Sequence, residues 1–343
     1  MKRFALAALA VCLWLSGCVR QTGEEPELKQ YNATFLNLFD TVTTVVGRAE
    51  SEEAFRAEAE KIRDNLEYYH QRFDIYHDYE GITNLKTIND QAGVAPVQVD
   101  KAVMELLLDC KAYYTLTGGK VNAAMGGVLS LWHDARTEAL RDPRNAYLPN
   151  ESELQNAATH ADISSLILDV EASTAYLADP DASLDVGAIA KGWATERVAQ
   201  STPSGMLISV GGNVCATGPK MSDGTPWVIG IQNPDDSSKN VHTIYVTGGC
   251  VVTSGDYQRA FAVDGKRYHH IINPETLMPA EYWRSVTVVC ADSGLADALS
   301  TALFLMPLEQ GRALALECGA QVLWIDASGA EFMTPGFEQM LRT

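Results

Sequence analysis

The sequence has few cysteines, and their spacing does not indicate a metal site or a disulfide framework. There are seven in 343 residues, and no two are spaced as CxxC. Two lie near the N-terminus, Cys12 and Cys18. The others stand in apolar surroundings, which favours buried free thiols over a zinc site or a disulfide scaffold. They are Cys110, Cys215, Cys250, Cys290 and Cys318.

Several common catalytic signatures are also missing. Without a GxGxxG fingerprint, a Walker loop or a GxSxG elbow, a Rossmann dinucleotide site, a P-loop NTPase and an α/β-hydrolase are disfavoured. None of the seven histidines is spaced as HxH or HExxH, so a histidine-ligated metal is not expected.

Basic residues are scarce, since 26 Lys and Arg against 44 Asp and Glu give a net charge of −18. Nucleic acid and anionic lipid headgroups are therefore poor partners for the general surface.

The apolar run at the N-terminus is too short for a membrane-spanning helix. It covers residues 4–15 and ends at Leu15-Ser16-Gly17-Cys18, which resembles the lipobox of bacterial lipoproteins. The resemblance implies a signal peptide over 1–17, lipid attachment to Cys18 and a lipidated tether over 18–30. We expect the chain to lie at the extracytoplasmic face of the cell membrane, and a soluble secreted protein is the alternative.

The periodicity of the remaining chain predicts an α+β fold. Apolar spacings of three and four predict helices over 51–74 and about 101–116, before short β-rich runs begin near residue 164. Helices over 188–199 and 293–305 interrupt these runs. The expected strands are 166–170, 206–210, 227–231, 243–247, 286–290 and 321–325. Because no Pro- or Ser-rich linker follows Gln30, we expect one compact unit of two lobes over 31–343, with mixed or antiparallel sheets flanked by helices.

Two short segments carry the clearest chemistry. The octapeptide Asp185–Gly192, DVGAIAKG, lies between a strand pattern and a helix pattern, where backbone N–H groups and a lysine suit a phosphate. A tight turn with the lysine in solvent is the simpler interpretation of such a match in isolation. Asp297 and Thr301 are four apart on an expected helix, so both oxygens share a face and suit Mg²⁺. An exposed aspartate beside a threonine bonded to its own helix is the alternative there.

Two further segments could approach a ligand. His269 and His270 are adjacent on an expected strand, so they point to opposite faces and at most one of them faces a site. The stretch Val210–Asn213, VGGN, follows an apolar strand and could bring the backbone close to a ligand.

Taken in order, these segments resemble the ApbE family, the FAD:protein FMN transferases. The matching motifs run from Phe39 to the region around Asp297. They are 39–41 (FDT), 73–76 (FDIY), 84–85 (NL), 88–89 (IN), 118–122 (GGKVN), 131–132 (LW), 184–192 (LDVGAIAKG), 210–213 (VGGN), 253–257 (TSGDY), 270–274 (HIINP) and 296–301 (ADALST).

The resemblance implies an ApbE-like (T-fold-like) domain and a role for each matching residue. FAD would be held by Phe39, Tyr76, Lys120, Val121, Asn122, Asp185, Lys191 and Ile271, and Mg²⁺ by Asp297, Thr301 and the backbone carbonyl of Ala188. His270 falls on the family's candidate catalytic histidine. The implied reaction is attack by a threonine hydroxyl of a client protein on the FMN-side phosphorus of FAD, so that FMN is attached through a phosphoester bond and AMP leaves. The client would be a subunit of a membrane redox complex of the sodium-pumping or Rnf type.

Three positions depart from the family pattern, and three other functions remain open. The family often has Asp at Asn122 and Asn273 and Gly at Leu277. Asn122 keeps an acceptor but loses a charge, which leaves its FAD contact open, and we expect a different turn after His270. The alternatives are an FAD pyrophosphatase that releases FMN and AMP, a non-enzymatic FAD-binding lipoprotein, and a covalent flavin carrier. The carrier is disfavoured because the acceptor position of the matching segment is Glu331, in what reads as a Ser-Gly hairpin turn.

Overall fold

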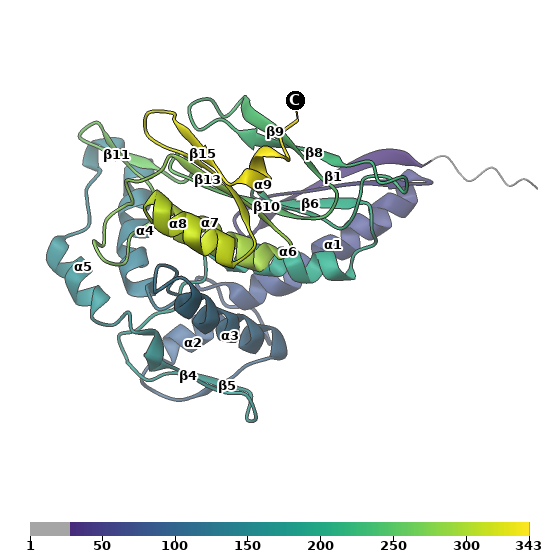
Figure 1. Ribbon diagram of the computed structural model, residues 1–343. Coiled ribbons are helices and arrows are strands. Elements are labelled where there is room, and N and C mark those ends of the chain that lie inside the picture. Colours follow the sequence, from purple (N-terminus) through teal and green to yellow (C-terminus); the bar gives the residue numbers. More distant parts are fainter. Residues whose placement is uncertain (1–27, 343) are drawn as a thin grey trace, which may run out of the picture.

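An eight-stranded sheet forms the larger of two lobes in the computed structural model, which describes residues 28–342 (Figure 1). The strand order is β1-β2-β6-β7-β10-β13-β14-β15, and each neighbouring pair is antiparallel. The bounds are β1 (Lys29–Leu38), β2 (Thr41–Ala49), β6 (Met206–Val210), β7 (Asn213–Ala216), β10 (Gly249–Gly255), β13 (Ser285–Cys290), β14 (Gln321–Ile325) and β15 (Glu331–Met333). The central strands are rich in valine because both faces of the sheet are covered.

Four helices cover one face of this sheet, and a β-hairpin with a short helix covers the other (Figure 1). The helices are α1 (Glu52–Phe73), α6 (Ala190–Ser201), α7 (Ser293–Phe304) and α8 (Leu308–Glu317); the opposite layer is β8 (Trp227–Gln232), β9 (Asn240–Val246) and α9 (Pro335–Glu338). Successive residues of β10 alternate between the two layers. Val252 belongs to the core under the helices, whereas Val251 belongs to the core under the hairpin.

The smaller lobe is mainly helical. It contains α2 (Leu85–Asp90), α3 (Lys101–Leu116), α4 (Gly126–Arg141), α5 (Glu151–Ala158), 3₁₀ turns at Pro143–Asn145 and Ile163–Ser165, the strands β3 (Val97–Gln98), β4 (Leu166–Asp169) and β5 (Thr174–Leu177), and the hairpin β11 (Phe261–Val263) with β12 (Lys266–Tyr268). The three-stranded sheet has the order β3-β5-β4. Trp132 of α4 packs against Phe261 and Tyr268, which joins the β11–β12 hairpin to this lobe.

The α+β class and its two lobes are confirmed, and the expected helices and strands match within a few residues. Ser51 caps α1 by accepting a hydrogen bond from the Ala54 N–H, and Phe55, Ile62 and Leu66 form its buried stripe. The expectation that helices come first is wrong, because the described residues begin with the β1–β2 hairpin at the sheet edge. β1 starts at Lys29, so the expected tether over 18–30 overlaps the strand by two residues.

The signal peptide expected over 1–17 and Cys18 lie outside the described residues. Among residues 28–342, no helix combines the length and apolarity that crossing a bilayer requires.

Two tight hairpin turns lie at the same end of the large sheet. The turn between β1 and β2 has positive φ at Phe39 (51°) and Asp40 (53°), and the turn between β6 and β7 has positive φ at Gly211 (58°) and Gly212 (93°). Positive φ at both central residues is the type I′ arrangement, which matches the twist of antiparallel strands. The turns also touch, because a Cβ on Gly211 would lie 2.6 Å from Thr41 Oγ1. Glycine at this position lets the two turns meet.

Candidate active site

A cavity of about 780 Å³ opens where the two lobes meet. The β1–β2 and β6–β7 turns, α4, α7 and the segments around residues 188, 258 and 270 form its walls. Of the residues that the sequence singled out, the structure places these on the cavity wall: Tyr76, Lys120, Val121, Asn122, Asp185, Ala188, Lys191, His270, Ile271, Asp297 and Thr301. Residues distant in the sequence therefore share one space.

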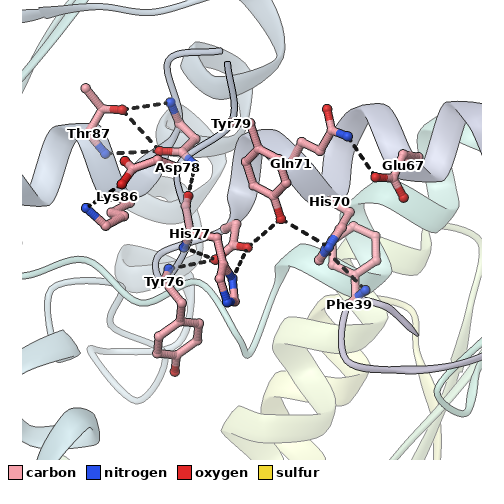
Figure 2. Close-up of polar contacts among 12 residues, drawn as sticks. Phe39, Glu67, His70, Gln71, Tyr76, His77, Asp78, Tyr79, Lys86 and Thr87 are labelled. Atoms are coloured by element: carbon pink, nitrogen blue, oxygen red, sulfur yellow. Dashed lines mark hydrogen bonds and ion pairs between the residues drawn. The ribbon is translucent and has the colours of Figure 1, made fainter. Parts of the chain in front are cut away.

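Phe39 lies beside this cavity rather than in it. It lines an adjoining pocket of about 120 Å³ whose walls include Tyr76, Asp185 and Lys191, which also line the main cavity. The backbone N–H of Phe39 donates to His70 Nδ1 of α1 at 3.3 Å (Figure 2). The two pockets thus share a wall, and α1 holds the loop that carries Phe39.

A hydrogen-bond network at the C-terminal end of α1 positions the Tyr76 loop (Figure 2). Asp74 is buried; its Oδ1 accepts from the Tyr76 N–H at 2.6 Å, and its Oδ2 accepts from the Tyr79 hydroxyl at 2.8 Å. His77 Nδ1 lies 2.9 Å from the same Oδ2. Desolvation opposes ionisation of Asp74, but these hydrogen bonds outweigh it and lower the pKa of the carboxyl. Asp74 is therefore held ionised as an acceptor for the loop.

Tyr76 presents an aromatic face to the cavity. Its side chain points away from the Asp74 network (Figure 2), and the residue is 50% exposed. The ring stacks on His133 of α4, with centroids 5.3 Å apart and an interplanar angle of 30°. Desolvation, with Asp185 nearby, raises the pKa of Tyr76 to about 12, so the phenol stays neutral. A flat, half-exposed aromatic pair can stack on the ring system of a ligand.

Asp297 lies at the contact between α6 and α7. Its residue is 4% exposed, its Oδ2 accepts from the Gly192 N–H at 2.8 Å, and Lys191 Nζ lies 3.7 Å from the same oxygen. Burial raises the pKa of the Asp297 carboxyl, and Lys191 and the Gly192 N–H partly offset that effect. The approach is close, because a Cβ on Gly192 would lie 2.2 Å from the Ser293 carbonyl oxygen and 2.4 Å from Asp297 Cβ.

Ala188 lies just before α6, whose N-cap is Ile189, so its carbonyl stands outside the hydrogen-bond ladder of the helix. Gly192 is in the first turn of α6, and its N–H, which has no helical acceptor, donates to Asp297. Within residues 28–342, the Ala188 carbonyl, Asp297 Oδ1 and Thr301 Oγ1 accept no hydrogen bond. All three residues line the cavity, and three oxygen donors including a carboxylate fit Mg²⁺.

Asp185 and Lys191 occupy the two ends of the octapeptide turn. Asp185 Oδ1 accepts from the Gly187 N–H at 2.7 Å, and Lys191 Nζ donates to the Gly187 carbonyl at 3.2 Å. Burial raises the pKa of Asp185, against the opposing effects of the Gly187 N–H and the nearby Arg259. The turn therefore carries a lysine whose ammonium group reaches the cavity wall.

The two histidines have different surroundings, as predicted, but the strand expected to carry them is wrong: β12 ends at Tyr268, and both lie in the segment after it. His269 is largely buried; its Nε2 lies 2.8 Å from the Ala280 carbonyl oxygen, and its Nδ1 accepts from the Ile271 N–H. Both ring nitrogens of His269 are engaged, which is a structural role. His270 is exposed to the cavity, where desolvation and then Arg259 and other cations lower the pKa of its imidazole. The lowered pKa is about 3, so the ring is neutral at pH 7 but a weaker base than an ordinary imidazole while these cations are unopposed.

Two of the family departures have local explanations. Asn122 Nδ2 donates to the Ala161 carbonyl at 2.8 Å, a bond that an aspartate could not make, while its Oδ1 accepts from the Ala124 N–H at 2.9 Å. The expectation of a different turn at Leu277 assumed that only glycine would take positive φ there. This assumption is wrong, because Leu277 itself adopts positive φ (60°). The Trp132 Nε1–H donates to the Leu277 carbonyl at 2.9 Å and holds this conformation.

At the third departure, Asn273, the side-chain Oδ1 accepts from the Glu275 N–H at 2.9 Å and shapes the turn. Lys120 Nζ lies 2.7 Å from Glu275 Oε1, so an ion pair joins this turn to the 120–122 segment.

Two arginines in the cavity were missed from the sequence. Arg136 of α4 and Arg259 both line it, and neither forms an ion pair with a carboxylate within residues 28–342. Arg136 Nε and Asn213 Nδ2 are buried at the wall without a hydrogen-bond partner in that range. Unpaired buried donors are costly, so these groups suit an anionic or oxygen-rich ligand. Arg136 lies one helical turn after Trp132, a signal that was available only if α4 had been recognised.

The fold and the cavity together define an α+β protein with a cation-rich, oxygen-lined site between two lobes. The model of the ApbE family matches residues 39–324. An FAD:protein FMN transferase from Treponema pallidum is 34% identical over 260 residues, 70% of each chain, and one from Escherichia coli K12 is 25% identical over 352 residues, 98% of this chain and 97% of the other. The solved ApbE protein of Thermotoga maritima superposes with a TM-score of 0.80 at 30% identity, over 92% of this chain and 100% of that one. The chain belongs to the ApbE family.

Proposed function

We propose that this chain is an FAD:protein FMN transferase, which moves the FMN part of FAD onto a client flavoprotein. Membership of the family confirms the expected enzyme class. The observation that carries the proposal is that Lys191, Asp297 and His270, from three separate segments, line one cavity. Phosphoryl transfer requires positive charge near the phosphates and a group that accepts the proton of the attacking alcohol.

FAD occupies the main cavity and the adjoining pocket in this proposal. The residues that hold it are Phe39, Tyr76, Lys120, Val121, Asn122, Asp185, Lys191 and Ile271. Arg136 and Arg259, which lack carboxylate partners in the described chain, add positive charge for its anionic groups. The stacked pair of Tyr76 and His133 offers a face for an aromatic ring.

Asp297, Thr301 and the Ala188 carbonyl hold Mg²⁺ in this proposal, since their free oxygens face one cavity. When bound, the ion would offset the negative charge of the diphosphate of FAD. Lys191 contributes a second positive charge beside Asp297, 3.7 Å from its carboxylate.

The reacting alcohol is a threonine hydroxyl of the client. Its oxygen bonds to the FMN-side phosphorus, the bond from this phosphorus to the bridging oxygen breaks, and AMP departs. In this proposal His270 accepts the hydroxyl proton; its ring is neutral in the cavity, and the negative charge of bound FAD would offset the cations that lower its pKa. The product carries FMN in a phosphoester bond.

Intact-mass measurement of a client domain incubated with FAD and Mg²⁺ tests this function. We expect the client to gain the mass of FMN less one water, and AMP to appear in equal amount. His270→Ala should lose transfer and keep FAD binding, and Asp297→Ala should lose activity together with its dependence on Mg²⁺. The matched control is His242→Ala, because His242 of β9 pairs with Glu331 of β15 at 2.7 Å and does not line the cavity. A fully active His270→Ala variant would refute its role as base.

The same measurement separates the alternative functions. AMP and FMN without added client mass would indicate an FAD pyrophosphatase, and bound FAD without AMP a non-enzymatic binding protein. A carrier is disfavoured by the local structure, since Asp326 Oδ1 accepts from the Ser328 N–H in a hairpin turn. Glu331 starts β15 and pairs with His242, so no hydroxyl acceptor stands there.

We further propose that Cys18 carries the lipid and anchors the chain at the extracytoplasmic face of the cell membrane, where it meets a client subunit of an Rnf or sodium-pumping redox complex. Replacing Cys18 with serine should move the protein from the membrane fraction to the soluble extracytoplasmic fraction. Retention in the membrane fraction would contradict the anchor.

A further inference from the structure

Three cysteines lie side by side on adjacent strands, and none of the three lines the candidate active site. In the strand register, Cys250 of β10 is opposite Cys215 of β7 on one side and opposite Cys290 of β13 on the other. Residues directly opposite each other in an antiparallel pair project from the same face of the sheet. This face is covered by α6 and α7, because Cys250 Sγ lies 3.8 Å from Glu196 Oε2 of α6.

Cys215 and Cys250 are the closest of the three. Both are buried free thiols in the structure, as the sequence predicted, and their Sγ atoms are 2.6 Å apart. Cα atoms of opposite residues in an antiparallel pair lie about 4.5–5.5 Å apart, within the range of about 4.4–6.8 Å that disulfides span. Cys290 instead directs its Sγ to the Asp292 carbonyl oxygen at 3.1 Å.

The arrangement favours a covalent bond over a metal site. Glu196, Cys215 and Cys250 form a group whose ligand atoms lie within 4.8 Å of one another, so zinc has to be considered. Tetrahedral zinc with bonds of about 2.3 Å keeps two sulfur ligands about 3.7 Å apart. The observed 2.6 Å is well below that separation. The Glu196 carboxylate is also engaged, since its Oε2 accepts from the Ser293 N–H at 2.8 Å.

We propose that Cys215 and Cys250 form a redox-sensitive disulfide that joins β7 to β10. The oxidant is a protein disulfide or oxidised glutathione. One cysteine thiolate attacks a sulfur of that disulfide and releases one thiol; the second cysteine then displaces the other thiol. Two electrons and two protons pass to the oxidant in total. Because the fold buries both sulfurs, exchange takes place before these strands pair or while they are locally open.

The bond would tie together two segments of the cavity wall. Asn213 lies two residues before Cys215, and Thr253 lies three after Cys250; both line the cavity. The two cysteines are 35 residues apart in the chain. Closing a loop of that length restricts the unfolded chain, so reduction should lower the melting temperature by roughly 5–10 °C. This inference does not depend on the proposed flavin transfer.

Thiol mapping of the full chain tests the proposal. The protein is equilibrated in buffers of oxidised and reduced glutathione, unfolded with iodoacetamide present, and digested for peptide mass spectrometry. We expect a peptide linked through Cys215 and Cys250 in oxidising buffer, with alkylation of the three other cysteines within residues 28–342. They are Cys110, Cys290 and Cys318. Complete alkylation of all five, or a link from Cys250 to Cys290, would overturn the proposal.

Two variants keep the test decisive. Cys215→Ser should abolish the change in melting temperature between oxidising and reducing buffer. Cys110→Ser is the matched control, since Cys110 is also buried but lies on α3, and it should keep that change. Equimolar zinc in the purified protein that is lost in Cys215→Ser would also overturn the disulfide, in favour of a metal site at Glu196.

Discussion

Replacing Gly192 with alanine tests how closely α6 must approach α7. The added Cβ would lie 2.2 Å from the Ser293 carbonyl oxygen and 2.4 Å from Asp297 Cβ, so backbone must move. Overpacking of this kind costs about 1–3 kcal/mol. Weakening the bond from the Gly192 N–H to a buried carboxylate costs a further 1.5–3 kcal/mol or so, and the helix propensity of alanine returns at most about 1 kcal/mol.

The expected net loss is about 1.5–6 kcal/mol, which lowers the melting temperature of a chain of this size by roughly 3–12 °C. The cation site should suffer as well. Displacing the Gly192 N–H removes a hydrogen bond that positions the carboxylate of Asp297, a proposed Mg²⁺ ligand. We expect the Mg²⁺ concentration that gives half-maximal FMN transfer to rise roughly tenfold or more. Each factor of ten corresponds to about 1.4 kcal/mol of lost Mg²⁺ binding.

Thermal unfolding and Mg²⁺ titration of transfer are the assays. Gly127→Ala is the matched control, because Gly127 lies in α4 and its added Cβ would meet Ala157 Cβ at an ordinary 3.6 Å. Asp297→Asn separates packing from charge, since it keeps an oxygen for the Gly192 N–H and removes the negative charge. If Gly192→Ala matches Gly127→Ala in melting temperature and Mg²⁺ dependence, the proposed role of the close contact is wrong.

Three further predictions concern other parts of the site. The lowered pKa of Asp74 stabilises the fold above the carboxyl's ordinary pKa, and this stability is lost as the pH falls through the folded value. Asp74→Asn should therefore lose about 1–3 kcal/mol of stability at pH 7 and flatten the acid limb of a plot of melting temperature against pH. An unchanged plot would contradict this. Asp40→Gly should raise stability by about 0.5–1 kcal/mol, whereas Asp40→Ala should lower it in the same denaturant titration, because Asp40 has φ of 53°. Arg136→Met should raise the Kd for FAD about tenfold in a fluorescence titration while Arg144→Met, an exposed control, leaves it unchanged; equal affinities would remove Arg136 from the ligand site.

Elements with strong periodicity were predictable, and those without a local signal were not. α1 was located within a residue at each end because its apolar stripe and its Ser51 cap agree. The β1–β2 hairpin was missed because Phe39 and Asp40 occupy positions that normally call for Asn-Gly, so the sequence shows no turn there. α4 did carry a pattern, since Val128, Trp132, Ala135 and Ala139 follow helical spacing and are buried.

The site was predictable where motifs carry it and not where tertiary contacts do. The octapeptide and the Asp297–Thr301 pair were both recognised in the sequence. Gly192 and Asp297 are 105 positions apart, however, and nothing in the sequence indicates that the two motifs touch. Arg136 and Arg259 come from different elements and have no motif of their own. Their shared role depends on how α4 and the loop after β10 meet at the cavity, which only tertiary packing determines.

The glycine at the end of the octapeptide serves a different purpose from the one its sequence context suggests. Glycines at such a turn usually allow positive φ, but Gly192 is helical and is absent from the positive-φ residues among those described. What it requires is space, because Asp297 and Ser293 of α7 occupy the volume that a side chain would fill. The same contact brings the Gly192 N–H to Asp297, which lines the cavity together with Ala188. The two motifs are therefore halves of one site, and the missing Cβ is what allows the lysine-bearing turn and the carboxylate-bearing helix to meet.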